Sequence, residues 1–140
     1  MDETILKQRL QEAFIEDWEI MPTGGGFLIV TDWHWPNSER IEIHIRPVGE
    51  REDLYIVSDG GELFNLLFSQ GVDLSKDERG MKILDGVTKN YGAKAVDCQI
   101  AKGAGLGDLH RAIRVVLEAI KDASFLLWYK LDDDGGACLH

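Results

Sequence analysis

The chain has 140 residues, 44% hydrophobic and 29% charged, which is long enough to bury one core and too apolar for a disordered protein. Its formal net charge is −10 and its lysines and arginines form no cluster, so we expect no direct binding to nucleic acid. No run approaches the ~20 apolar residues that cross a bilayer, and the N-terminal sequence lacks the layout of a secretion signal. With Cys98 and Cys138 as its two thiols, we predict a cytoplasmic protein without disulfides or membrane contact.

The negative charge is concentrated in the first half of the chain. Residues 1–62 contain 14 acidic and 5 basic side chains, a balance of −9, whereas residues 63–130 contain 8 acidic and 10 basic ones, a balance of +2. Such a polarised molecule should be attracted to basic surfaces, although acidity can also serve solubility alone.

Periodicity predicts a helix followed by a sheet in the first half. Apolar residues recur at helical spacing from Thr4 to Trp18. After Pro22 and a run of three glycines, apolar or alternating segments at 27–33, 41–46 and 54–57 predict three strands. Because short turns separate these strands, we predict an antiparallel meander.

Three helices and one strand are predicted in the second half. Asp59 and Glu62 resemble a capping box, which predicts that Asp59 caps a helix ending near Gly71. A second helix follows Ser75, and alternation from Val96 to Ile100 predicts the fourth strand. A flexible turn at 103–107 then leads to a long helix capped by Asp108, whose apolar stripe runs to Leu127.

The predicted fold is α+β, in the order α-β-β-β-α-α-β-α. It is a four-stranded, largely antiparallel sheet with helices packed on one face. Residues 1–130 form one domain, and the acidic, glycine-containing segment 131–140 is expected to be a disordered tail.

Four side chains near the hairpin are candidates for catalysis: Asp32, His34, His44 and Asp59. If Thr31 lies opposite Ile45, then Asp32 faces His44 across the hairpin, and such a pair can act as a general base or bind a metal. The alternative is an exposed pair that only fixes the strand register. Since no nucleophile or third ligand is evident, we expect no metal site and no cofactor.

Aromatic residues at the hairpin tip give the stronger functional signal. Trp33, His34 and Trp35 precede a turn where two tryptophans cannot both reach a core, and exposed tryptophan is enriched at binding hot spots. The acidic residues around them are Asp32, Glu39 and Glu42. This group is predicted to bind a basic protein surface, unless one tryptophan folds back over the sheet edge.

A second aromatic group closes the last helix. Phe125, Trp128 and Tyr129 belong to a segment that is apolar on all sides. Such a helix end either lies in the centre of the core or forms a homodimer contact, and we favour the homodimer.

One segment carries a family resemblance. The strand at 54–57, the turn Ser58-Asp59-Gly60-Gly61, the helix after it and the step Gly71-Val72-Asp73-Leu74 resemble an uncharacterised domain-of-unknown-function family of bacteria and their phages. The similarity covers roughly residues 27–125. It implies no catalytic residues, but it implies a bacterial or phage origin.

The function predicted from the sequence is that of a non-catalytic interaction protein. It would bind a basic surface of a nucleic-acid-handling or defence complex and act as an inhibitor. Two alternatives stay open. One is a small metal-dependent hydrolase or nucleic-acid-modifying enzyme using Asp32, His44 and Asp59, and the other is a regulatory, antitoxin-like partner protein.

Overall fold

The computed structural model describes residues 3–11, 18–51 and 53–128. The elements are, in chain order, α1 (Glu3–Gln11), β1 (Glu19–Pro22), β2 (Phe27–His34), β3 (Arg40–Pro47), β4 (Leu54–Ser58), α2 (Glu62–Ser69), the 3₁₀ turn η1 (Leu74–Lys76), α3 (Glu78–Asn90), β5 (Lys94–Val96), β6 (Gln99–Gly105), the 3₁₀ turn η2 (Leu106–Asp108) and α4 (Leu109–Ala123). The predicted tail at 131–140 lies outside the described residues.

The strands form one antiparallel sheet in the order β1-β2-β3-β4-β6-β5. The α+β class, the antiparallel sheet and the four α-helices are therefore confirmed. The prediction of four strands is wrong, because the described residues contain six.

The first additional strand is β1, which pairs Glu19 with Val30 and Pro22 with Phe27. The helical pattern was expected to reach Trp18, but α1 is described only to Gln11 and residue 18 is not helical. A four-residue strand at a sheet edge is too short to show a period of its own, so it could not be recognised from the pattern of residues.

The second additional strand is β5, which was not predicted because the residues of β5 and β6 alternate as those of one strand would. Val96, Cys98 and Ile100 alternate with polar residues as a single strand would, yet Val96 pairs with Gln99 across a two-residue turn. Asp97 and Cys98 both have positive φ, 51° and 59°, as the favoured hairpin turns require. The flexible turn predicted at 103–107 is wrong for its first residues, because Gly103 and Gly105 belong to β6 and pair with β4.

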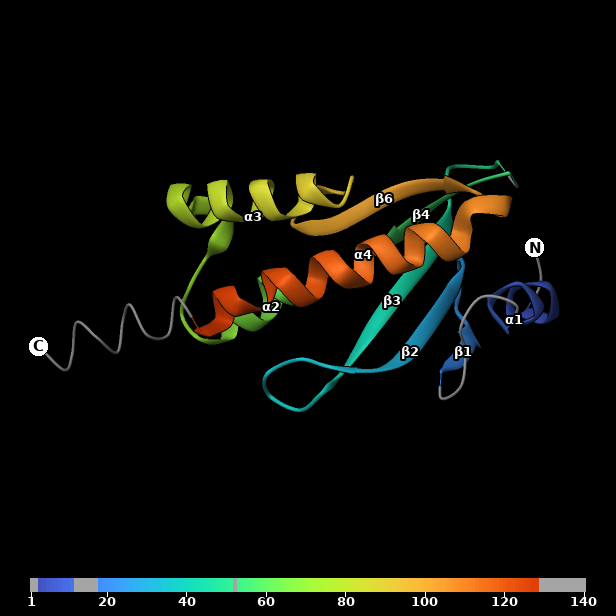
Figure 1. The fold of residues 1–140 in the computed structure, drawn as a ribbon, viewed down its shortest axis with the longest axis horizontal. Helices are drawn as coiled ribbons and strands as arrows, with labels where there is room; N and C mark the ends of the chain where they lie inside the picture. The colour runs from blue at the N-terminus through green and yellow to red at the C-terminus, as the bar shows by residue number, and fades with distance from the viewer. Residues whose placement is uncertain (1–2, 12–17, 52, 129–140) are drawn as a thin grey trace, which may run out of the picture.

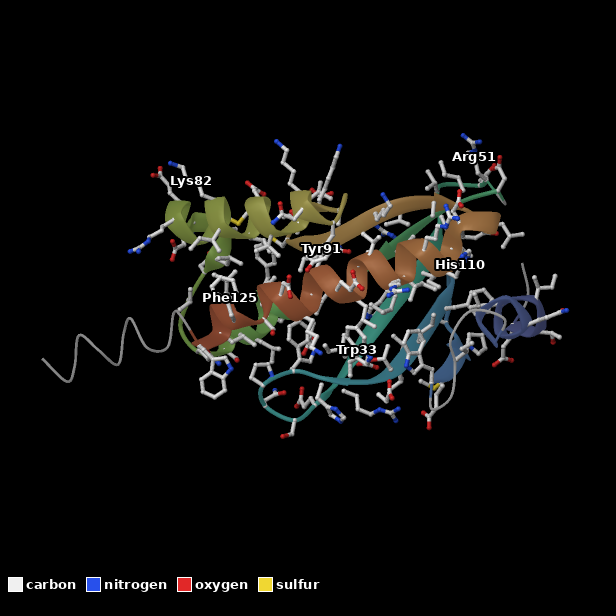
Figure 2. The ribbon with its side chains drawn as sticks, in the orientation of Figure 1. Trp33, Arg51, Lys82, Tyr91, His110 and Phe125 are labelled. Atoms are coloured by element: carbon white, nitrogen blue, oxygen red, sulfur yellow. The ribbon has the colours of Figure 1, made fainter. Side chains whose placement is uncertain are left out.

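The core lies between the sheet and α4, which crosses one face of it (Figure 1). Ile45, Val57 and Ile100 from the sheet are at most 1% exposed. The predicted stripe of α4 is confirmed, because its members Ile113, Val116, Leu117, Ile120 and Ala123 are all buried. The hydroxyl of Tyr91 donates a hydrogen bond to Asp122 and ties the end of α3 to α4 (Figure 2).

Candidate functional site

The hairpin of β2 and β3 has a different register from the one predicted. Phe27, and not Thr31, lies opposite Ile45, and His44 lies opposite Leu28. The shift is four residues, an even number, so each side chain stays on the same face of the sheet, and Ile29, Ile43 and Ile45 are buried. The proposed pairing of Asp32 with His44 is wrong.

Two features cause this difference. At the tip, His34 pairs with Arg40, two residues from the predicted register, and a bulge between Val30 and His34 adds two more. The side chain of Thr31 lies inside it and donates a hydrogen bond from Oγ1 to the carbonyl oxygen of Ile41, at 2.7 Å. The Arg40 Nε donates to the carbonyl oxygen of Thr31 at 2.6 Å. Asp32 is therefore carried away from the β3 ladder, and its Oδ1 accepts a hydrogen bond from Trp18 Nε1 at 2.8 Å.

The hot-spot prediction assumed that both hairpin tryptophans are exposed, but one of them is buried. Trp35 is only 3% exposed and belongs to the core. Trp33 is half-buried, and the Lys121 Nζ of α4 lies 4.7 Å from the centroid of its ring (Figure 2). The alternative reading, in which a tryptophan folds back over the sheet, describes Trp35. The partner-binding role of this region stays a prediction.

The turn of the hairpin borders a pocket of about 340 Å³. Its residues come from the β2–β3 hairpin, the end of β4 and the first turn of α2. They are Val30, Trp35, Glu39, Arg40, Glu42, His44, Asp59 and Glu62. Because four of these side chains are carboxylic acids, we call this hollow the acidic pocket. The pocket brings His44 and Asp59 together with Glu39 and Glu42. The other predicted site residues, Asp32, Trp33 and His34, do not line it, and the side chain of His34 is exposed on β2.

Asp59 forms the floor of the acidic pocket and is 1% exposed. Its Oδ1 accepts hydrogen bonds from the backbone N–H groups of Gly61 and Ile100, at 2.9 and 3.0 Å. Its Oδ2 accepts one from the Leu63 N–H at 3.3 Å in the first turn of α2, but the N-cap residue is Gly61, so the prediction that Asp59 occupies the cap is wrong. Burial raises the pKa of Asp59, while these three hydrogen bonds oppose the rise.

His44 covers the turn that follows Asp59. Gly60 has φ +66°, and a Cβ built there would lie 2.4 Å from the His44 Nε2. Position 60 therefore requires glycine both for its backbone conformation and for the space that the imidazole occupies. The imidazole lies beside the turn that follows the buried carboxylate of Asp59, whose charged form the histidine favours.

Glu62 begins α2 and faces the same pocket. Its pKa is raised, mainly by partial burial and then by the negative charges of Glu39, Glu42 and Asp59. Four carboxylic acids thus share the space with the guanidinium of Arg40 and the imidazole of His44, and a cationic group entering the pocket would relieve the repulsion between the carboxylates. Sequence reasoning missed Glu62 as a site residue, although its place at the first turn of a predicted helix was visible.

The other side of the hairpin turn borders a second hollow, of about 140 Å³. Its lining residues are Pro36, Asn37, Leu66, Gln70, Leu127 and Trp128, and we call it the apolar groove. The chain continues past α4 as a helical turn at 125–128, in which Leu126 and Leu127 are buried. Phe125 (Figure 2) and Trp128 are 43% and 54% exposed, and Tyr129 lies outside the described residues.

Comparison with protein-family models, with curated proteins and with solved structures finds no significant match to this chain. The resemblance to a bacterial and phage domain family accordingly stays a prediction. Within the described ranges, no helix is long and apolar enough to cross a membrane. The same residues include no group of three or more His, Cys, Asp or Glu side chains arranged to hold a metal ion.

Proposed function

We propose that this chain is a non-catalytic interaction module whose acidic pocket receives a lysine or arginine side chain from a basic protein surface. The observation that carries the proposal is the composition of the pocket, in which four carboxylic acids accompany one guanidinium and one imidazole. Burial and, after it, the negative charges of Glu39, Glu42 and Asp59 raise the pKa of Glu62, and a bound cation would lower it.

The geometry favours this function over the hydrolase alternative. Asp32 does not line the pocket, and it accepts a hydrogen bond from Trp18. Both oxygens of Asp59 accept backbone hydrogen bonds that hold α2 and β6 in place, which suits a structural carboxylate. The proposed partner, a nucleic-acid-handling or defence complex, and the inhibitor-like action follow from the resemblance and the net charge of −10.

The proposal is tested by capture of a partner from bacterial lysate, followed by measurement of its affinity by calorimetry. Glu39→Gln with Glu42→Gln removes two charges from the pocket, and Glu78→Gln with Asp85→Asn removes two from the exposed surface of α3. We expect the pocket variant to lose at least tenfold in affinity and the α3 variant to lose far less, with wild-type binding weakened by salt. Equal losses in the two variants would refute the pocket as the binding site.

A further inference from the structure

The acidic pocket and the apolar groove adjoin the same two elements. The hairpin turn contributes Trp35 and Glu39 to the pocket and Pro36 and Asn37 to the groove. Along α2, Glu62 lines the pocket, and Leu66, one helical turn later, lines the groove. A ligand that enters one hollow therefore reaches the other by passing the hairpin turn or following α2.

The groove has the character of an anchor site for an apolar side chain. Trp128, at its edge, is a large aromatic residue that is 54% exposed, and Leu66 is half-buried against the core. Tryptophan and well-packed apolar hollows dominate the binding energy of protein interfaces. The charge on the adjoining pocket decides the chemistry of the occupant, because an acidic segment would be repelled by Glu39, Glu42 and Glu62.

We propose that the two hollows bind one segment of the partner, in which a lysine or arginine enters the acidic pocket and a neighbouring apolar side chain enters the groove. This inference rests on the proposed function and specifies its partner. Leu66 and Gln70 follow Glu62 by four and eight residues, or about 6 and 12 Å along a helix axis. An extended peptide rises about 3.3 Å per residue and alternates its side chains between two faces, so the basic and apolar residues should stand two or four positions apart.

Each hollow contains its own tryptophan, which makes the two binding events separately observable. The protein is labelled with 5-fluorotryptophan and followed by ¹⁹F NMR, where Trp35 reports on the pocket and Trp128 on the groove. Trp18 and Trp33 line neither hollow and serve as internal references. Trp18 donates a hydrogen bond to Asp32, and Trp33 lies beside Lys121. The probes are synthetic Gly/Ser peptides with one arginine and one leucine, separated by one to eight positions.

We expect both reporter resonances to shift with peptides in which arginine and leucine stand two or four positions apart, and replacement of leucine by serine to weaken binding about tenfold. The variant Leu66→Gln should remove this preference for leucine, whereas Phe68→Gln should not. Phe68 lies on the same helix, is 69% exposed and does not line the groove. Circular dichroism of both variants checks that the fold is kept.

Other results separate the two proposals. A shift of Trp35 alone at every spacing would overturn the two-hollow inference and leave the proposed function standing. No shift of either resonance would overturn the inference together with the cation-binding role of the pocket. A Trp128 resonance that moves with protein concentration alone would assign the groove to a second copy of this chain and overturn the inference.

Discussion

The Asp59 Oδ1 accepts a hydrogen bond from the backbone N–H of Ile100, a residue 41 positions later in the chain. The same carboxylate accepts hydrogen bonds from the backbone N–H groups of Gly61 and Leu63 at the start of α2. One buried side chain thus joins the end of β4, the first turn of α2 and the beginning of β6. The floor of the acidic pocket is fixed by this junction.

Asp59→Asn should lower the free energy of unfolding by about 2–4 kcal/mol, because an amide cannot accept all three backbone hydrogen bonds and brings donors of its own. Asp73→Asn is the matched control, since asparagine caps a helical turn about as well as aspartate and Asp73 is an exposed cap. Urea denaturation of both variants makes the comparison. Similar losses would show that the Asp59 network contributes little.

Gly60→Ala should cost more stability than Gly49→Ala, although both glycines have positive φ, +66° and +58°. A Cβ at position 49 meets nothing within 4 Å, so that variant measures backbone strain alone, about 1 kcal/mol. In a His44→Ala background, the cost of Gly60→Ala should fall to the same level. An unchanged cost in that background would contradict the contact between His44 and Gly60.

The stability of the protein should fall as the pH rises through the folded-state pKa of Glu62. The pKa of this group is raised above its ordinary value of 4.5, so the folded state holds its proton more tightly than the unfolded state does. The resulting stabilisation is complete below about pH 4.5 and is lost at higher pH. Glu62→Gln removes this contribution, and its stability relative to wild type should rise from pH 4.5 to pH 7.5.

Thermal melts at intervals across that range provide the measurement, with Glu78→Gln on α3 as the control for removal of one exposed carboxylate. A constant difference between Glu62→Gln and wild type at every pH would contradict the electrostatic origin of the shift. The pH dependence of the stability of the wild type also includes a contribution of the same sign from Asp59, whose pKa is raised from 3.8.

Replacing Asp97-Cys98 by Asn-Gly should raise the free energy of unfolding by about 1 kcal/mol, since both positions have positive φ and this pair suits such a turn. Cys98→Ser keeps a side chain at φ 59° and should give no such gain, which separates backbone relief from removal of the exposed thiol. Chemical denaturation measures both, and a gain in the serine variant would refute the conformational explanation.

Local features of the sequence predicted a large part of the fold. The α4 stripe through Ile113, Val116 and Ile120 is confirmed because one face of a long helix must be apolar to be buried. The alternation of Ile41, Ile43 and Ile45 likewise identified the buried face of β3. Asp59 was placed correctly at the start of α2 because residues only a few positions apart decide where a helix begins, although Gly61 occupies the N-cap itself.

The candidate site was predictable only in part. Glu39, Glu42, His44 and Asp59 were named from their residue types, and the structure places all four in one pocket. The pairing of Asp32 with His44 is wrong because the hairpin tip is two residues tighter than predicted and a bulge shifts the register by two more, and neither change alters the alternation of apolar residues. The burial of Trp35 was not predicted for a related reason. A hydrophobic residue near a turn is buried only if the turn folds back on another element, and the local pattern does not show this.

The sequence by itself determined the fold class, the helix faces and the negative charge, because these depend on the order and spacing of neighbouring residues. Tertiary structure alone decided the strand register, the burial of Trp35 and the meeting of Asp59 with Ile100. Those features arise from contacts between segments distant in the chain, where packing and hydrogen bonding select one of several arrangements that the local pattern allows equally.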